Sequence, residues 1–213
     1  MSTRMHIDSP PIGFLGGTFD PIQLGHTGIA QAALRDCRLS QVVFIPCFKP
    51  PHRALPIASP ADRLAMTKLA IAHFPQFSIS TLEMDARNVS YTYKTALMLR
   101  QQYPNTPLCF IVGEDAFAQF DTWDEAEVIL QNMHLIVVSR EGYPNRAFKT
   151  CAIEDLHQTL SGKLYHLNIS SLPFSATRIR HQLMAGATHI PGLNPKIFAY
   201  IQQNNLYNRS VHS

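Results

Sequence analysis

The stretch from Ile12 to His26 restricts the possible folds of this chain more than any other part of the sequence. It begins with an apolar run, Ile12 to Leu15, which predicts a buried strand. We expect Gly16-Gly17 to break this strand and Asp20-Pro21 to form a turn. Gly25-His26 then begins a segment in which apolar residues recur at helical spacing. This succession predicts a phosphate-binding device, because glycine-turn N–H groups and a helix N-terminus both favour an anion.

Strands and helices are predicted to alternate along the rest of the chain. The expected strands cover residues 42–45, 77–82, 108–112, 134–138 and 163–168, and the expected helices residues 60–74, 93–103, 116–120, 123–132, 175–184 and 195–201. Such alternation predicts an α/β fold, a Rossmann-like parallel sheet with helices on both faces. We expect a single domain over residues 1–213, with a core over about 12–170 and a small C-terminal helical extension over about 171–207.

The segment between residues 46 and 59 has the composition of an exposed loop. It contains four prolines and the run Lys49-Pro50-Pro51-His52-Arg53, which fits neither a helix nor a central strand. This loop is our candidate for a segment that moves over a ligand. Ser59-Pro60 is a typical helix start, and the apolar spacing after it predicts an inward face made of Ala61, Leu64, Ala65, Leu69 and Ala72.

Charge and composition favour a cytoplasmic enzyme that acts on a small anionic molecule. The net charge of +3 over 213 residues suits a polyanionic ligand and is too weak to indicate a nucleic-acid partner. No apolar stretch approaches the roughly 20 residues that a membrane span requires, and residues 1–10 lack the apolar segment of a signal peptide. The four cysteines are widely spaced, so we expect reduced thiols. The sequence leaves the oligomeric state open.

Ligands of open parallel sheets bind outside the carboxyl ends of the strands, so the residues that follow each strand are the candidates for a site. The polar ones are Gly16 to Asp20, Cys47 to Arg53, Gly113 to Asp115, and Arg140. The chain contains neither a GxxxxGK[ST] loop nor a GxGxxG fingerprint, so a P-loop and a nicotinamide-dependent dehydrogenase have no support. The histidines lack metal-ligand spacing, and we expect no protein-bound metal.

The stretch Gly16-Gly-Thr-Phe-Asp-Pro-Ile-Gln-Leu-Gly-His26 resembles the GGTFDPxHxGH signature of the nucleotidyltransferases that carry (H/T)xGH. Within that superfamily the chain is similar to the bacterial nicotinate-nucleotide adenylyltransferases over residues 12–207, because further segments follow in the order of that family. These are Pro50-Pro51-His52-Arg53, Ser90-Tyr91-Thr92, Gly113-Glu114-Asp115, Thr122-Trp123, His134-Leu-Ile-Val-Val138, Arg140 with Gly142-Tyr143-Pro144, and Ser175-Ala176-Thr177-Arg178-Ile179-Arg180. A spaced set of this kind is specific, whereas the first motif alone would not be.

The resemblance implies an enzyme of the nucleotidyltransferase fold that transfers the adenylyl group of ATP to nicotinate mononucleotide, giving deamido-NAD and pyrophosphate in NAD biosynthesis. Because the attacking phosphate is already ionised at neutral pH, such a reaction needs in-line positioning and charge stabilisation but no general base. The resemblance implies catalytic roles for His26, Gln23 and Arg180, and Mg²⁺ bridging the triphosphate. The implied ATP-binding residues are Gly16, Gly17, Thr18, Phe19, Gly25, His26, Ser175, Thr177 and Arg180.

On the acceptor side, the resemblance implies that nicotinate mononucleotide contacts Tyr91, Thr92, Asp115, Trp123 and Arg140. Backbone amides around Tyr91 and Thr92 suit the nicotinate carboxylate, and Trp123, the only tryptophan, suits stacking on the pyridine ring. Further candidates, which equally fit a solvated loop, are Lys49, His52 and Arg53.

Gln23 stands where that family has the first histidine of HxGH. A glutamine can donate a neutral hydrogen bond to a phosphate but cannot carry a proton's charge. Two alternatives therefore stay open. One is a nucleotide-binding protein with little catalysis. The other is a related adenylyltransferase with another phosphorylated acceptor, such as phosphopantetheine, although the chain length and the Ser90-Tyr91-Thr92, Trp123 and Arg140 set argue against it.

Overall fold

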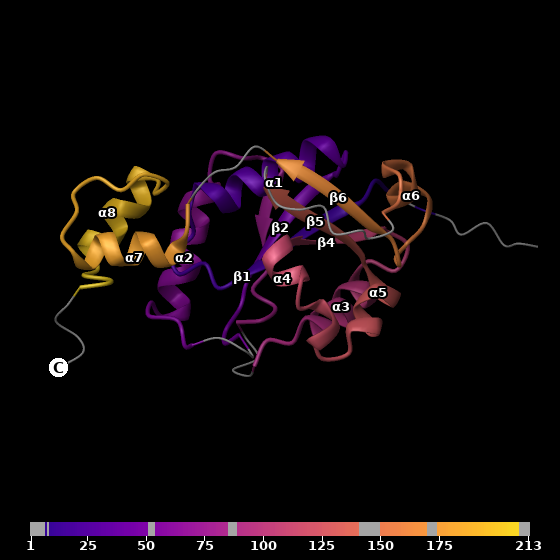
Figure 1. The fold of residues 1–213 in the computed structure, drawn as a ribbon, viewed down its shortest axis with the longest axis horizontal. Coiled ribbons are helices and arrows are strands. Elements are labelled where there is room, and N and C mark those ends of the chain that lie inside the picture. Colours follow the sequence, from indigo (N-terminus) through magenta and orange to yellow (C-terminus); the bar gives the residue numbers. More distant parts are fainter. Residues whose placement is uncertain are drawn as a thin grey trace, which may run out of the picture.

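A six-stranded parallel sheet forms the centre of the protein (Figure 1). The computed structural model describes residues 7, 9–50, 54–84, 89–140, 150–169 and 174–208. The strands run in the order β3-β2-β1-β4-β5-β6, which is the Rossmann order and confirms the predicted α/β fold. β1 lies between β2 and β4, so the chain changes direction across the sheet at this point. The six strands are β1 (Ile12–Gly17), β2 (Gln41–Pro46), β3 (Phe77–Ile79), β4 (Leu108–Gly113), β5 (His134–Arg140) and β6 (Leu164–Ile169).

Helices cover both faces of the sheet, as the alternation predicted, and Figure 1 shows α1 along one side with α3 and α5 along the other. Successive strand residues point to opposite faces, so Leu15 joins one buried cluster and Phe14 the other. The first cluster holds side chains of α1 (Leu24–Asp36), α2 (Pro60–Ile71), α6 (Ile153–Gln158), α7 (Ala176–Met184) and α8 (Pro195–Gln203). The second holds side chains of α3 (Thr92–Gln102), α4 (Glu114–Phe117), the 3-10 turn η1 (Phe120–Thr122) and α5 (Ala126–Asn132).

Several element boundaries differ from those that the sequence predicted. Gly16 and Gly17 do not break the first strand, because they are its last two residues and pair with Ile45 and Pro46. Gly17 is required by close packing, since a Cβ there would lie 2.7 Å from the ring of Phe19. β3 is shorter than expected, and α6 was not predicted. The helix expected over 116–120 is replaced by α4 and η1, and the helix expected over 123–132 begins later, as α5, but ends at Asn132 as predicted.

The inward face of α2 is also different from the prediction. The helix begins as expected, with the Ser59 hydroxyl accepting from the N–H of Asp62. Its buried residues are Arg63, Met66, Thr67, Ala70 and Ile71, whereas Ala61 and Ala72 are exposed. The apolar spacing failed because a long cationic side chain, Arg63, finds acceptors inside the protein, which no hydrophobic pattern can indicate.

The C-terminal helices pack against the start of α2 and the turn that follows β1. α8 packs against α2, and both α7 and α8 lie at the left of Figure 1. The Tyr200 hydroxyl donates to Asp62 at 2.9 Å, and the buried Tyr207 hydroxyl donates to Asp20 at 2.6 Å. No helix among the described residues is both long and apolar enough to cross a membrane. All four cysteines are free thiols, as the sequence predicted.

The stability of the protein is expected to fall as the pH falls from 6.5 toward 4, because His134 is buried as a neutral ring. Its Nδ1 accepts from the N–H of Lys163, so Nε2 donates to the carbonyl of Thr159. Burial lowers the pKa of His134 to about 4. The unfolded chain therefore binds more protons across this interval, which costs roughly 2 kcal/mol of folding free energy between pH 7 and pH 5.

Urea unfolding at pH 7 and pH 5 measures this loss of stability. In His134→Gln the dependence on pH should be weaker than in the wild type, whereas His181→Gln, a change of an exposed histidine, should leave it unchanged. An equal dependence in the wild type and His134→Gln would contradict the prediction.

Candidate functional site

A cavity of about 470 Å³ opens at the carboxyl ends of β1 and β4, where the chain changes direction across the sheet. This is the position at which open α/β sheets bind ligands. Its wall combines the end of β1, the start of α1, the start of α3, and α4 with the segment after it. The predicted site residues in this wall are Gly16, Gly17, Thr18, Gln23, Gly25, His26, Tyr91, Thr92, Asp115 and Trp123. The structure thus brings residues from both halves of the predicted site to one cavity, whereas Phe19 lies outside its wall.

His26 is held in the wall as a neutral hydrogen-bond donor. It is the third residue of α1, and its Nδ1 accepts from the backbone N–H of Gln23 at 3.2 Å. Its ring also meets the ring of Phe19 edge-on, with centroids 5.1 Å apart. Burial lowers the pKa of His26 to about 4, so the ring is neutral at pH 7. With Nδ1 occupied as an acceptor, the single ring proton resides on Nε2, which is the donor that a phosphate oxygen requires.

Gln23 caps the same helix. Its side-chain oxygen accepts from the N–H of Gly25, and its Nε2 donates to the carbonyl of Phe174 at 3.2 Å. A Cβ on Gly25 would lie 2.6 Å from that oxygen, which explains why a glycine stands there. Gln23 lines the cavity, but its amide already joins the start of α1 to the segment that leads into α7.

The turn after β1 offers backbone donors to the same region. The N–H groups of Thr18 and Phe19 donate to no group within the described ranges. Phe19 has a φ of 50° and buries its ring against Phe44. The chain therefore turns away from β1 here, and the N–H groups of Thr18 and Phe19 do not bond to a neighbouring strand. Consecutive unpaired N–H groups beside a left-handed residue form a concavity that suits an anion.

Asp20 anchors this turn through buried hydrogen bonds, whereas the sequence predicted a turn at Asp20-Pro21 and a place for Asp20 among the candidate ligand-binding residues. Its carboxylate is buried and accepts from the N–H groups of Ile57 and Ala58 at 2.8 and 3.0 Å, besides the Tyr207 hydroxyl. Its backbone carbonyl accepts from Arg180 at 2.7 Å. The signal in the sequence is a carboxylate within a glycine-rich and apolar motif, because a carboxylate buried there needs hydrogen-bond donors from the surrounding chain.

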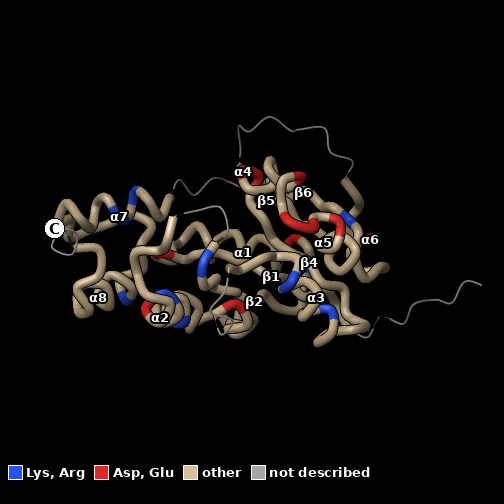
Figure 2. The backbone as a smooth tube through the Cα atoms, turned by 90° about the horizontal axis from the view of Figure 1, so that it is seen from below, with Lys and Arg blue, Asp and Glu red and all other residues tan. Residues whose placement is uncertain are grey.

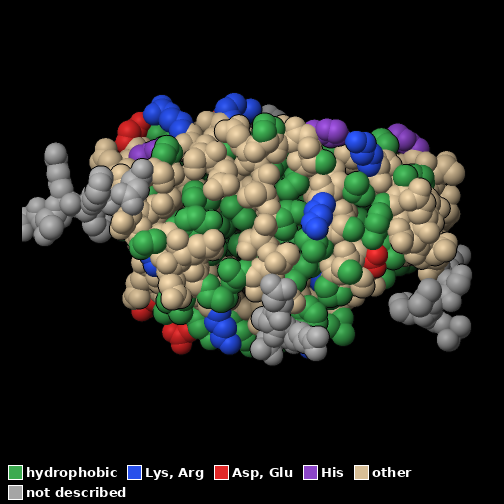
Figure 3. Space-filling view, turned by 180° about the vertical axis from the view of Figure 1, so that it is seen from behind, with side chains coloured by type: hydrophobic (Ala, Val, Ile, Leu, Met, Phe, Trp, Pro, Cys, Tyr) green, Lys and Arg blue, Asp and Glu red, His purple; other side chains and the backbone are tan. Residues whose placement is uncertain are grey.

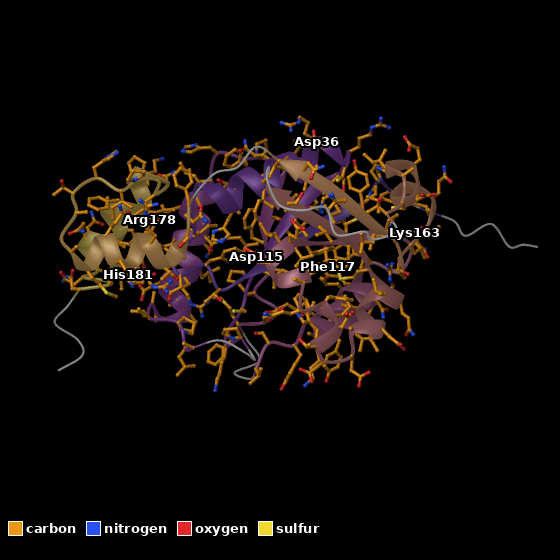
Figure 4. The ribbon with its side chains drawn as sticks, viewed as in Figure 1. Asp36, Asp115, Phe117, Lys163, Arg178 and His181 are labelled. Carbon is orange, nitrogen blue, oxygen red and sulfur yellow. The ribbon has the colours of Figure 1, made fainter. Side chains whose placement is uncertain are left out.

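Ser175, Thr177 and Arg180 do not line the main cavity. They lie at the start of α7, where Ser175 accepts from the N–H of Arg178 and Arg180 donates to Thr177 at 3.2 Å. A smaller hollow of about 220 Å³ includes Ser175 and shares Phe174 with the main cavity. Figure 4 shows Arg178 and His181 on α7, well to one side of Asp115 on α4. Besides the bond from Gln23 to Phe174, the bond from Arg180 to the Asp20 carbonyl joins this helix to the turn after β1.

The acceptor side of the cavity is built from the start of α3 and from Trp123. Tyr91 is the N-cap residue of α3 but makes no side-chain cap, so the first amides of the helix have no partner from that side chain. Trp123 packs edge-on against Phe110, with centroids 6.1 Å apart, and this fixes the indole beside the cavity. Asp115 is an exposed residue of the same wall.

The structure does not bring every predicted residue to the cavity. Lys49 is exposed and lies outside the wall, although its neighbour Pro50 is part of it. His52 and Arg53 lie outside the described residues. Arg140 ends β5, and its side chain is likewise not described.

Charge is unevenly distributed around the cavity. Figure 2 shows acidic residues gathered around α4 and α5 and basic ones on α2 and α7. On the face seen in Figure 3, the Lys, Arg and His side chains are scattered among hydrophobic and polar ones. The acidic group consists of Glu114, Asp115, Asp121, Asp124, Glu125 and Glu127. The Trp123 side of the cavity thus favours a cation, whereas the α1 side favours an anion because the N-terminus of that helix lies there.

Glu83 is a cavity residue that the sequence did not indicate. It follows β3, lines the wall, and accepts from the hydroxyl of Thr95 at 2.7 Å. Burial raises its pKa. Glu83 directly follows the strand predicted over 77–82, so its place after a strand was the available signal. Other wall residues that were missed include Phe110, Gln119, Asp124, Ile169 and Phe174, whereas Cys47 belongs to a segment that the sequence indicated.

Within the described part of the chain, no three His, Cys, Asp or Glu side chains gather into a set that could hold a metal ion. The cavity residues therefore fit Mg²⁺ that is bound by the oxygens of a triphosphate better than a metal ion that is bound by the protein alone.

Comparisons with known proteins agree with one another. The Cytidylyltransferase-like family model matches residues 14–182. A protein of Coxiella burnetii named "Probable nicotinate-nucleotide adenylyltransferase" is 40% identical over 211 residues, which cover 93% of this chain and 98% of the relative. A protein of Acidithiobacillus ferrooxidans with the same name is 38% identical over 205 residues, which cover 91% and 94%.

Solved structures share the fold. Plasmodium falciparum nicotinic acid mononucleotide adenylyltransferase complexed with NaAD matches with a TM-score of 0.75 at 20% identity, over 93% of this chain and 98% of that one. The same enzyme complexed with APC matches with a TM-score of 0.73 at 20% identity and equal coverage.

Proposed function

The chain belongs to the nicotinate-nucleotide adenylyltransferases of the cytidylyltransferase-like family, and from this premise we propose that it transfers the adenylyl group of ATP to nicotinate mononucleotide. The products are deamido-NAD and pyrophosphate. The observation that carries the proposal is the single cavity that joins the turn after β1 and His26 to the start of α3 and Trp123. A reaction that joins two nucleotides needs both of them in one such space.

The ATP half of the proposed site supplies donors and needs no base. The phosphate of the acceptor is an ionised nucleophile, so the protein has only to align it with the α-phosphate and to stabilise the charge that moves to pyrophosphate. His26 offers Nε2 as a donor to the α-phosphate, beside the unpaired amides of Thr18 and Phe19. Arg180, Ser175 and Thr177 are proposed for the outer phosphates from the start of α7. Mg²⁺ is proposed as part of the ATP complex, held by triphosphate oxygens and water.

The acceptor half suits a ring that carries a positive charge and a carboxylate. The pyridine nitrogen of the mononucleotide is bonded to ribose and is therefore cationic, which favours the face of Trp123 and the acidic surroundings of Asp115. The first amides of α3, next to Tyr91 and Thr92, are proposed to receive the nicotinate carboxylate. The amide group of a nicotinamide would present N–H to those donors and leave them unpaired.

Release of pyrophosphate from ATP tests the proposal, with nicotinate mononucleotide, nicotinamide mononucleotide and phosphopantetheine offered side by side. We expect turnover with the first acceptor, a rate roughly 10²-fold or more lower with the second, and no turnover with phosphopantetheine. Tight ATP binding without turnover of any acceptor would favour the nucleotide-binding alternative that Gln23 raised. Turnover of phosphopantetheine alone would favour the other transferase.

A further inference from the structure

Arg63 is a buried cation that neither the sequence pattern nor the proposed mechanism has used. It lies in the first turn of α2, has no exposed surface, and is the largest fully buried side chain in the described ranges. Its Nη1 donates to the carbonyls of Thr18 at 2.7 Å and Cys47 at 2.6 Å. Its Nη2 donates to the carbonyl of Phe48 at 3.1 Å, and its Nε to that of Ala58 at 3.3 Å.

A buried guanidinium of this kind is costly to the fold. No carboxylate among the described residues lies within ion-pair distance of Arg63, and burial lowers its pKa. Arginine nevertheless stays charged in proteins, so Arg63 depends on four backbone carbonyls that accept its hydrogen bonds and on the longer-range attraction of the buried Asp20 carboxylate. A methionine would fill similar space without this cost. Unlike methionine, the guanidinium is a rigid planar group whose N–H donors can bond several carbonyls that lie in different directions.

The Ala58 carbonyl lies just before α2, whereas the other three carbonyls that Arg63 holds belong to the two segments that leave β1 and β2 at the cavity. Thr18 and Cys47 both line it. In a planar trans peptide, the N–H lies opposite the carbonyl. Holding the Thr18 carbonyl therefore fixes the direction of the Phe19 N–H, one of the unpaired amides of the turn.

The second segment continues to the acceptor half of the site. The N–H of Phe48 donates to the Ser90 hydroxyl at 3.1 Å, and the N–H of Ser90 donates to the carbonyl of Lys49 at 2.9 Å. Ser90 immediately precedes Tyr91 and Thr92 at the start of α3. Arg63 thus bonds on one side to the turn proposed for ATP, and on the other to a segment bonded to the acceptor half.

We propose, on the basis of the proposed function, that Arg63 is a positioning residue for adenylyl transfer. It fixes the turn after β1 and the segment after β2 relative to each other, so that the α-phosphate of ATP and the phosphate of the acceptor are aligned for in-line attack. It touches neither substrate and acts through the backbone. Because misplacement by about 1 Å can cost on the order of 10²-fold in rate, its loss should act mainly on kcat.

Arg100 is a matched control within the same chain. Its guanidinium also donates to backbone carbonyls, those of Tyr103, Pro104, Thr106, Asn132 and Leu160. Burial lowers its pKa as well. These carbonyls lie just before β4, β5 and β6, at the amino ends of the strands, whereas the cavity lies at the carboxyl ends. Arg100 therefore stabilises the fold without contacting the site.

The experiment compares Arg63→Met with Arg100→Met. Both variants should unfold at lower urea concentration than the wild type. With ATP and nicotinate mononucleotide, Arg63→Met should lose on the order of 10²-fold in kcat, whereas Arg100→Met should keep kcat within about twofold at a temperature where both remain folded. Similar kcat losses in the two variants would overturn the proposal. An inactive wild type would instead overturn the proposed function and, with it, the role of Arg63 in adenylyl transfer.

Arg63→Lys keeps the charge and provides a second, milder variant if Arg63→Met fails to fold. An ammonium is a point donor and cannot hold diverging carbonyls as a planar fork does. We expect kcat to remain at least about tenfold below the wild type in this variant. Full recovery of kcat would overturn the proposal, because charge alone would then account for Arg63.

Discussion

Replacing His26 with alanine is expected to lower kcat about 10²–10³-fold, the usual cost of removing one donor from a developing transition-state charge. The reason is geometric. His26 Nδ1 is engaged by the N–H of Gln23, so the ring proton is on Nε2, in a residue that lines the cavity. Steady-state kinetics with saturating ATP and nicotinate mononucleotide measure the loss.

His26 also belongs to the cap of α1, so its two roles have to be separated. Glutamine at this third helical position can accept from the N-cap N–H and preserve the capping box. His26→Gln should therefore be as stable as the wild type in urea, yet still lose roughly tenfold or more in kcat. The control is His181→Ala, which changes an exposed histidine on α7 and should leave kcat unaltered. Wild-type kcat in His26→Ala would contradict the role of the histidine.

Replacing Asp20 with alanine is expected to cost about 3–5 kcal/mol of stability, the scale seen when one member of a buried charged network is removed. The substitution leaves the N–H groups of Ile57 and Ala58 and the Tyr207 hydroxyl without their acceptor. Urea unfolding followed by the fluorescence of Trp123, the single tryptophan, provides the measurement.

Two further variants provide reference values for the loss of stability in Asp20→Ala. Tyr207→Phe removes one of the three donors and should cost only about 1–2 kcal/mol. Asp36→Ala removes a carboxylate whose ion pair with Arg35 lies on the surface, and should change stability by less than about 1 kcal/mol. If Asp20→Ala were no more destabilising than Tyr207→Phe, the two loop amides would not depend on the carboxylate.

Most of the fold could be predicted from the sequence, because a parallel sheet leaves a strong local signal. Strands buried on both faces are continuous apolar runs, and those at 42–45, 108–112 and 134–138 are confirmed within β2, β4 and β5. Capping residues fixed helix starts equally well, since Ser59, Ser175 and Asn194 all accept from amides of the helices they begin. The helix over 153–158 was missed because it is short and begins at Ala152, which offers no oxygen for a cap.

The candidate site was predicted less completely. His26, Tyr91, Thr92 and Trp123 belong to motifs and line the cavity. Arg63 and Glu83 belong to no motif, and their importance comes from partners distant in the sequence. The bonds from Arg63 to Thr18 and Cys47 span 45 and 16 residues, which no local pattern encodes.

The sequence by itself determined the strand and helix alternation, the helix caps and the motif that leads to His26, because these depend on neighbours within a few residues. Only the tertiary structure decided how the polar groups are used. It placed Gln23 as a cap bonded to Phe174, turned Asp20 into an anchor for the loop and the C-terminal segment, and buried Arg63 among carbonyls. The physical reason is that a buried polar group must find partners wherever the folded chain brings them, and those partners are set by topology.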